Sequence, residues 1–204
     1  MVTPPITQLP GFHDPVHDAQ QTFRALLDAL ARPGHPQTTA MVTAPAGLSP
    51  GCAAACLTLM DLETTVWLQP GLPEAVKSWL LFHTGCRFTA HPEAADFAVM
   101  IDCETMPNLD EFKWGTAEYP EASTSLLIQL PSLHVGDTVT LQGPGIWGAI
   151  ALQTSLHQSF WQQWQEMATD YPLGVDAWCF AEQQVIGLPR TAQVVPKTAQ
   201  KPEA

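Results

Sequence analysis

The chain has 204 residues, of which 46% are hydrophobic and only 14% are charged, and this length suits one domain with a substantial core. The 20 Asp and Glu against 8 Lys and Arg give a formal net charge of −12, which repels DNA and RNA and excludes nucleic-acid binding. A surface so poor in charge indicates contact with other protein chains.

The N-terminal part predicts an extended arm followed by the clearest helix. We expect a proline-rich arm over residues 1–13, a single α/β domain over residues 14–195 and a disordered tail over residues 196–204. In DPVHDAQQTFRALLDALARPG, Asp14 is the expected N-cap and Gly34 follows the end. Apolar residues at steps of three and four predict one buried helix face, made of Val16, Ala19, Phe23, Leu26, Leu27 and Leu30.

Helices and strands alternate through the next part of the chain. Capping and turn signals predict helices over residues 49–61 and 72–85, the second with Gly85 at its end. Short apolar runs predict strands over residues 64–70 and 95–102, the second one fully buried.

The second half of the chain is richer in strands. Residues 123–133 and 137–143 are expected to form adjacent strands joined by the turn residues of PSLHVG. A late amphipathic helix is expected over residues 153–170, and the last two strands over residues 175–182 and 184–190. The order of elements predicts the α/β class, with a mixed β-sheet sandwiched by helices.

The cysteines and the first residues indicate a reducing compartment. No signal peptide is expected at the start of the chain, and no window is long enough to span a membrane. We therefore expect a cytoplasmic protein without contact with a membrane. The cysteines are odd in number and form no C-x-x-C pair, which favours free thiols over disulfides: Cys52, Cys56, Cys86, Cys103 and Cys179.

The glycine-rich stretch LQGPGIWG raises the question of a phosphate-binding loop. Gly143, Gly145 and Gly148 have the spacing G-x-G-x-x-G, but Pro144 removes one backbone donor and no cation follows. We interpret the stretch as the exit of a strand, where glycine avoids a steric penalty. Contact of Gly143 and Gly145 with a phosphate group is the alternative.

Two side chains are candidates for chemistry. Arg190, in GLPRT, follows a predicted strand and can bind a carboxylate or phosphate with two hydrogen bonds, or can pair with an acid of a neighbouring subunit. His83 lies at the C-terminal end of a predicted helix, where capping and catalysis both suit a histidine.

The sequence lacks the residues that several other kinds of catalytic or cofactor site require. There is no G-x-S-x-G elbow, and the cysteines do not have the spacing of a zinc site, so no metal site is expected. Pyridoxal phosphate needs a lysine in a dry pocket, and neither Lys77 nor Lys113 stands in such a setting. We therefore expect no cofactor in this chain.

Six stretches, taken in order, resemble the PhnH family, the H subunit of the carbon-phosphorus lyase system for phosphonate breakdown. They are HDPVHDAQQTFRALLDALARPG, WLLFHTG, GTAEYPEASTSLLIQL, LQGPGI, YPLGVD and GLPRT, and they span about residues 13–194. Each stretch is weak alone, whereas their order is specific.

The resemblance implies a bacterial cytoplasmic homodimer that joins the G, I and J subunits in a core complex. It implies a fold similar to that of pyridoxal-phosphate-dependent transferases without the cofactor. It also implies participation, with the G, I and L subunits, in displacing adenine from ATP by a phosphonate, so that MgATP is a substrate of the complex. This makes the chain a component of a ribose 1-methylphosphonate 5-triphosphate synthase, without activity alone.

Two hypotheses follow for the role of the chain. In the first, which we prefer, it is a non-catalytic assembly subunit. In the second, it is an enzyme subunit in which His83, Arg190 and the backbone of residues 143–145 hold a triphosphate or phosphonate, while Glu118 or Asp176 acts as base or metal ligand. The second hypothesis requires His83, Arg190 and the glycine loop to share one cleft.

Overall fold

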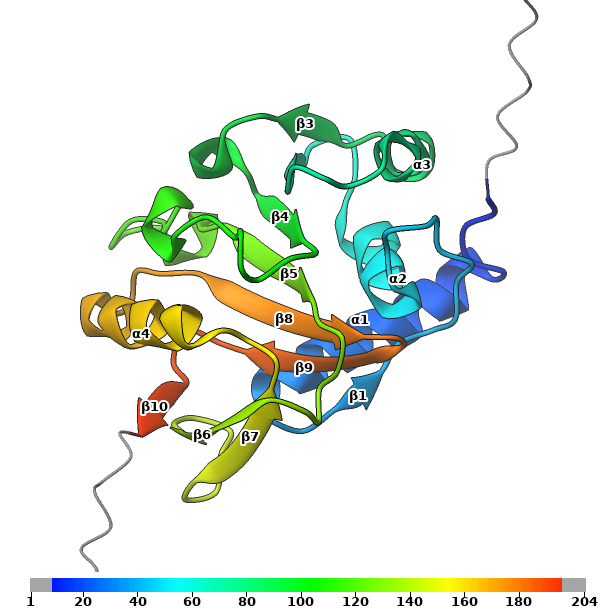
Figure 1. Ribbon diagram of the computed structural model, residues 1–204. Coiled ribbons are helices and arrows are strands. Elements are labelled where there is room, and N and C mark those ends of the chain that lie inside the picture. The colour runs from blue at the N-terminus through cyan, green and yellow to red at the C-terminus, as the bar shows by residue number, and fades with distance from the viewer. Residues whose placement is uncertain (1–8, 196–204) are drawn as a thin grey trace, which may run out of the picture.

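A computed structural model describes residues 9–195, arranged around a central sheet (Figure 1). The expected tail, residues 196–204, and residues 1–8 of the expected arm lie outside the described residues. Helices cover both faces of the central seven-stranded sheet, and a separate three-stranded sheet lies at one side of it (Figure 1). This arrangement confirms the predicted mixed α/β architecture.

The central sheet is mostly parallel and contains β1 (Gln37–Thr38), β2 (Thr65–Leu68), β3 (Arg87–Thr89), β4 (Phe97–Met100), β5 (Ser125–Gln129), β8 (Asp176–Ala181) and β9 (Gln184–Leu188). The strand order is β1-β9-β8-β5-β4-β2-β3. From β8 to β3 all neighbours are parallel, whereas β9 is antiparallel to β8 and β1. The carboxyl ends of the five parallel strands therefore lie along one edge of the sheet, and their amino ends along the other.

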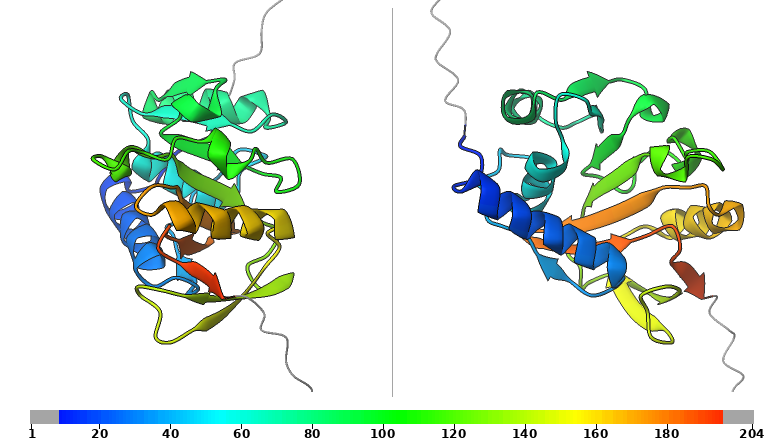
Figure 2. Two further views of the ribbon diagram at one scale, coloured as in Figure 1. Left: turned by 90° about the vertical axis from the view of Figure 1, so that its left-hand side faces the viewer. Right: turned by 180° about the vertical axis from the view of Figure 1, so that it is seen from behind.

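The helices cover two hydrophobic cores, one on each face of the central sheet. They are α1 (Pro15–Ala31), α2 (Pro50–Leu59), α3 (Glu74–Thr84) and α4 (Gln158–Met167). The first three cover one face of the sheet and α4 covers the other (Figures 1 and 2). Because successive strand residues point to opposite faces, Leu127 packs in the core of α1 to α3, and its neighbours Leu126 and Ile128 pack in the core of α4.

Local signals start and end the helices as predicted. Asp14 caps α1 by accepting from the backbone N–H groups of Val16 and His17, and Ser49 caps α2 by accepting from Cys52. Gly85 ends α3 in the left-handed conformation, with φ of 70°. These caps satisfy backbone groups that lack partners inside a helix.

Helix α1 lies close against β9 and crosses its face of the sheet (Figure 2). A Cβ at Gly187 of β9 would stand 2.5 Å from the carbonyl carbon of Ala29, so the approach requires glycine. Trp178 of β8 fixes the helix further by donating its indole N–H to the Leu26 carbonyl at 3.0 Å.

The buried face of α1 differs in part from the prediction. Leu26 is buried and Leu30 is partly buried, but Val16, Phe23 and Leu27 are exposed. Close packing on β9 selects small side chains instead, so the buried positions of the helix are Thr22, Ala25, Leu26 and Ala29.

The second sheet corrects two further predictions. It consists of β6 (Asp137–Gln142), β7 (Ile150–Thr154) and β10 (Gln193–Val195), in the antiparallel order β10-β6-β7. The expected pairing of residues 123–133 with 137–143 is wrong, because β5 pairs with β4 and β8 while β6 belongs to this other sheet. The expected helix over residues 153–170 begins later, at Gln158, since residues 150–154 pair with β6.

Four short 3-10 helices complete the described chain: η1 (Pro92–Ala94), η2 (Leu109–Glu111), η3 (Pro120–Ala122) and η4 (Ala168–Asp170). Both η2 and η3 belong to the long connection between β4 and β5. Among residues 9–195, no helix combines the length and the apolar character needed to cross a membrane.

Candidate functional site

Arg190 and Asp176 form an ion pair at the amino end of β8. The Asp176 carboxylate accepts from the backbone N–H (2.8 Å) and the Nε–H (3.2 Å) of Arg190, and also from Nη2. Nη1 donates to the carbonyls of Pro120 (2.9 Å) and Pro172 (3.2 Å), and Nη2 donates to the Ser123 hydroxyl (2.6 Å). All five N–H groups of the guanidinium are therefore occupied within the chain.

A cavity of about 380 Å³ opens beside this ion pair. The side chains of Glu121, Tyr171 and Thr191 line it together with Arg190 and Asp176. It lies at the amino ends of β5 and β8, whereas ligands of α/β proteins usually bind at the carboxyl ends of the strands. For Arg190 to bind an anion here, at least one of its present hydrogen bonds has to break.

The glycine-rich turn lies near this cavity, but two of its glycines pack against backbone carbonyl groups of other segments of the chain. Gly143 follows the last residue of β6, which confirms a strand exit, and a Cβ there would stand 2.6 Å from the Thr191 carbonyl oxygen. A Cβ at Gly145 would stand 2.1 Å from the Ala31 carbonyl oxygen, at the end of α1. The turn also carries Trp147, whose side chain is wholly exposed. Phosphate binding by Gly143 and Gly145 stays a prediction.

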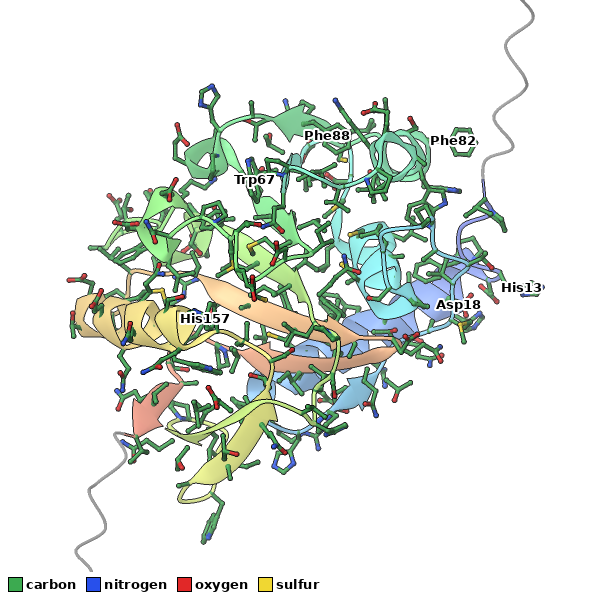
Figure 3. The ribbon with its side chains drawn as sticks, viewed as in Figure 1. His13, Asp18, Trp67, Phe82, Phe88 and His157 are labelled. Carbon is green, nitrogen blue, oxygen red and sulfur yellow. The ribbon has the colours of Figure 1, made fainter. Side chains whose placement is uncertain are left out.

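His83 lies away from the Arg190 cavity. Its Nε2–H donates to the Leu9 carbonyl at 3.0 Å, and its ring meets the Trp79 ring edge-on at a centroid distance of 4.9 Å. His83 thus holds the segment before α1 against α3, while the neighbouring Phe82 points outward (Figure 3). Helix α3 and the end of β9 stand on opposite sides of the molecule (Figures 1 and 2). The single cleft required by the pocket hypothesis therefore does not include His83.

Glu118 is exposed in the turn before η3 and is not among the residues that line the Arg190 cavity. Asp176 is the one candidate acid that the structure places beside Arg190. Catalytic roles for His83, Glu118 and Asp176 stay predictions.

Two glutamine side chains tie the carboxyl ends of parallel strands to neighbouring segments. Gln69 follows β2 and is 2% exposed. Its Oε1 accepts from the backbone N–H groups of Ile101 (2.8 Å) and Asp102 (2.9 Å), and its Nε2 donates to the Asp102 carbonyl (2.8 Å) and the Thr105 hydroxyl (3.2 Å). All the amide capacity of Gln69 is therefore used to join β2 to the segment after β4.

Gln129 has a similar position at the end of β5. Its side chain accepts from the backbone N–H of Ser49 and donates to the Gly47 carbonyl at 3.1 Å. Sequence analysis missed both glutamines, although Gln69 directly follows an apolar strand, in VWLQ, and Gln129 is the last residue of one, in LLIQ. A polar residue at the carboxyl end of a buried strand was the available signal.

The two lysines of the described chain stand in different surroundings. Lys77 is exposed, with Nζ 5.5 Å from the centroid of the Phe88 ring. Lys113 donates to Asp96 at 2.8 Å. Burial raises the pKa of Asp96, but the Lys113 hydrogen bond, a hydrogen bond from the Thr65 backbone and nearby positive charge outweigh burial and lower it.

The cysteines are free thiols in the structure, and only Cys103 is not fully buried. Burial, followed by the negative charge of Asp102, raises the pKa of Cys103 to about 11. Such a thiol is a poor nucleophile at neutral pH. Within residues 9–195, no group of three or more His, Cys, Asp or Glu residues is arranged to hold a metal ion.

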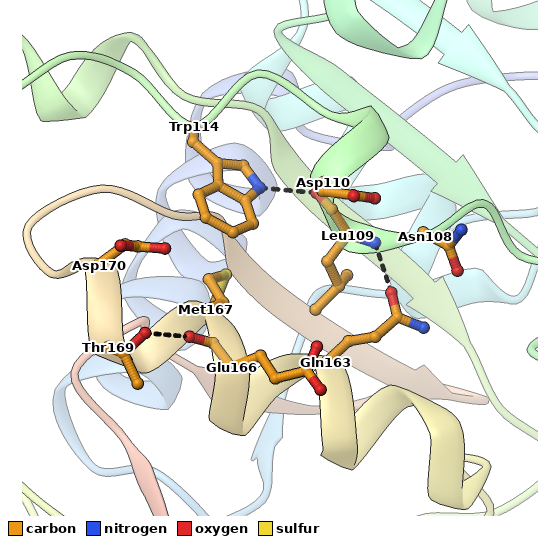
Figure 4. A pocket seen from close by; sticks show the side chains of 9 residues that line it. All are labelled: Asn108, Leu109, Asp110, Trp114, Gln163, Glu166, Met167, Thr169 and Asp170. Atoms are coloured by element: carbon orange, nitrogen blue, oxygen red, sulfur yellow. Dashed lines mark hydrogen bonds between the residues drawn. The ribbon is translucent and has the colours of Figure 1, made fainter.

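A second cavity, of about 470 Å³, lies between η2 and α4 (Figure 4). Trp114, Leu109 and Met167 form its apolar centre, and the carboxyl side chains of Asp110 and Asp170 stand on opposite sides of it (Figure 4). Sequence analysis gave no indication of this cavity, because its walls come from segments more than 50 residues apart.

The fold is that of a mixed α/β protein, and its candidate site is an arginine clamp, in which the donors of Arg190 bind groups of the same chain. Residues 10–195 match the family described as bacterial phosphonate metabolism protein (PhnH). The chain belongs to this family, which confirms the resemblance drawn from its sequence.

Two named relatives match most of the chain. One, from Rhizobium meliloti (strain 1021), is named alpha-D-ribose 1-methylphosphonate 5-triphosphate synthase subunit PhnH; it is 37% identical over 90% of this chain and 94% of its own length. The other, from Stutzerimonas stutzeri, is named putative C-P lyase subunit protein HtxG, and it is 31% identical over 86% of this chain and 85% of its own length.

Proposed function

We propose that this chain is an assembly subunit of an alpha-D-ribose 1-methylphosphonate 5-triphosphate synthase in the carbon-phosphorus lyase pathway. The observation that carries the proposal is the 37% identity, over 90% of the chain, to a relative named as a subunit of that synthase. The occupied donors of Arg190 support a structural role for this arginine.

The proposed complex acts in the bacterial cytoplasm and contains the G, I and J subunits. With the G, I and L subunits, this chain contributes to transfer of the ribose triphosphate moiety of MgATP to a phosphonate, with displacement of adenine. The chain itself holds no cofactor and has no activity alone. Its low content of charged residues supports burial against partners.

The fold is proposed to be related to that of pyridoxal-phosphate-dependent transferases without the cofactor. The mostly parallel sheet covered by helices on both faces supports this relation. Gln69 and Gln129 use their amide groups to bind the chain itself at the carboxyl edge, where α/β proteins usually bind ligands.

A homodimer is also part of the proposal. Val16, Phe23 and Leu27 lie seven and four residues apart and form an exposed apolar stripe on α1. A second copy of the chain would remove this stripe from water. Light scattering after size-exclusion chromatography should give twice the mass of one chain, and Phe23→Ser should shift it toward the monomer.

The alternative is an enzyme subunit with its own phosphate or nucleotide pocket. The cavity beside Arg190 and Asp176, with Thr191 of the same cavity adjoining Gly143, favours this second candidate. Titration calorimetry of the purified chain with MgATP and with methylphosphonate distinguishes the two. Heat of binding to the wild type that is lost in Arg190→Lys, at a temperature where urea denaturation shows that the variant is still folded, would favour the alternative.

Reconstitution tests the main proposal. The G, I and L subunits are mixed with MgATP and methylphosphonate, with and without this chain, and released adenine is measured by chromatography. We expect release only when this chain is present, and none from the chain alone. Equal release in its absence would contradict the proposal.

A further inference from the structure

The cavity between η2 and α4 has firmly fixed walls (Figure 4). The Gln163 Oε1 atom of α4 accepts from the Leu109 backbone N–H at 2.7 Å, which ties the two walls together. The Trp114 indole N–H donates to the Leu109 carbonyl at 2.7 Å and fixes the orientation of the ring. On the other side, the sulfur of Met167 accepts from the Val175 backbone N–H at 3.3 Å. The hollow is therefore formed before any partner arrives.

The centre of the cavity is apolar, whereas its rim is acidic. Trp114, Leu109 and Met167 form the centre, and Figure 4 shows the carboxyl groups of Asp110, Asp170 and Glu166 around them. The ion pairs among residues 9–195 all involve other acids, so none of these three carboxylates has a cation of the described chain within 4 Å.

We propose that this cavity receives an arginine side chain of a partner subunit. The aliphatic part of an arginine covers the apolar centre, while its guanidinium reaches the carboxylates of the rim. The exposed part of the Trp114 ring favours arginine over lysine, because a planar guanidinium stacks on an aromatic face.

The charge of the whole chain agrees with a basic partner surface. A formal net charge of −12 attracts positively charged segments from a distance, and a fixed acidic hollow then selects one side chain. The inference rests on the proposed function for the identity of the partner, which is another subunit of the complex.

A peptide titration tests the cavity independently of the complex. The probe is acetyl-Gly-Arg-Gly-amide, added to the ¹⁵N-labelled full chain, and the signal is the indole N–H resonance of Trp114, assigned with Trp114→Phe. We expect a saturable shift with a Kd on the order of 1 mM. The matched peptide with Gln in place of Arg should cause no shift. No shift with the arginine peptide at roughly ten times that concentration, or equal shifts with both peptides, overturns the proposal.

Association with partners is tested with two triple variants of equal charge change. The first neutralises the rim with Asp110→Asn, Glu166→Gln and Asp170→Asn. The control neutralises exposed acids outside the cavity with Glu63→Gln, Glu93→Gln and Glu104→Gln. Capture by the tagged G, I and J subunits should weaken about tenfold in the first and stay within about twofold in the control. Equal weakening in both would show a general charge effect and overturn the proposal.

The two proposals fail in different ways. If the wild-type chain does not associate with the subunits but binds the arginine peptide, the proposed function fails and the cavity has another partner. If the chain assembles normally, but neither the peptide nor the rim variant has an effect, the proposed function stands and the cavity proposal fails. Urea denaturation of both triple variants verifies that each is folded.

Discussion

Arg190, just past the end of β9, binds Asp176, the first residue of β8, through its backbone N–H at 2.8 Å and its guanidinium Nε–H at 3.2 Å. The same side chain reaches the carbonyls of Pro120 and Pro172, so one arginine fastens three segments that are distant in sequence. With only 12% of its side chain exposed, Arg190 resembles a buried structural arginine more than a free anion-binding group.

Arg190→Lys should destabilise the fold although it keeps the positive charge. Lysine cannot reproduce the five fixed donors, so part of the carbonyl and carboxylate partners lose their hydrogen bonds. We expect a loss of about 2–4 kcal/mol in the free energy of unfolding, measured by urea denaturation. Arg24→Lys, at an exposed position of α1, is the control and should change it by less than about 0.5 kcal/mol. Equal effects of the two substitutions would show that the hydrogen bonds of Arg190 do not stabilise the fold.

The glycine-rich turn offers a matched pair of substitutions. Gly145 has φ of +82°, and a Cβ there would meet the Ala31 carbonyl oxygen at 2.1 Å; Gly148 has φ of +73° with nothing within 4 Å of its Cβ position. Gly148→Ala should cost roughly 1–2 kcal/mol from backbone strain alone. Gly145→Ala should cost about 3 kcal/mol or more, measured by thermal unfolding. A similar cost at both positions would mean that the turn does not press on α1.

The ion pair of Asp96 and Lys113 makes a pH-dependent contribution to stability. Because the pKa of Asp96 is lowered in the folded state, its contribution is fully present above the unfolded value of about 3.9 and is lost as pH falls through the folded value. The difference in unfolding free energy between wild type and Asp96→Asn should therefore be largest at neutral pH and shrink below roughly pH 4. Glu104→Gln is the control, and a constant difference for Asp96→Asn across this range would contradict the assignment.

The Cys103 thiol should react slowly. With its pKa raised to about 11, alkylation at neutral pH should be on the order of a hundredfold slower than for thiols of the unfolded chain, as followed by mass spectrometry. Asp102→Asn removes the negative charge that is the smaller of the two causes of the raised pKa, and it should accelerate alkylation roughly twofold. Glu104→Gln changes the same charge two residues later in the chain. Identical rates in both variants would show that Asp102 does not act on this thiol.

Sequence patterns predicted the features that depend on local chemistry. The caps at Asp14 and Ser49 and the glycine at position 85 were found because each signal and the helix end that it marks lie within a few residues. The buried face of α1 was predicted wrongly in part, because the close approach of Gly187 decides which helix positions face the sheet. No periodicity within the helix contains that information.

The same distinction applies to the candidate site. Arg190 and Asp176 were both named from the sequence, but in separate roles; the hairpin register, which pairs Ala177 with Leu188, would have placed them side by side. The cavity walls depend on the contact between Leu109 and Gln163, which only the folded chain brings together. The separation of His83 from Arg190 likewise follows from the strand order, which local patterns do not specify.

Trp147 can serve as an intrinsic fluorescent probe of contacts at the surface. Its indole stands wholly in solvent, while the other six tryptophans are buried or partly buried. A collisional quencher such as acrylamide reaches this one fluorophore first. Protection of the quenched emission on mixing with another subunit would locate the β6–β7 turn inside a contact, and unchanged quenching would locate it outside, in either case without attaching a dye.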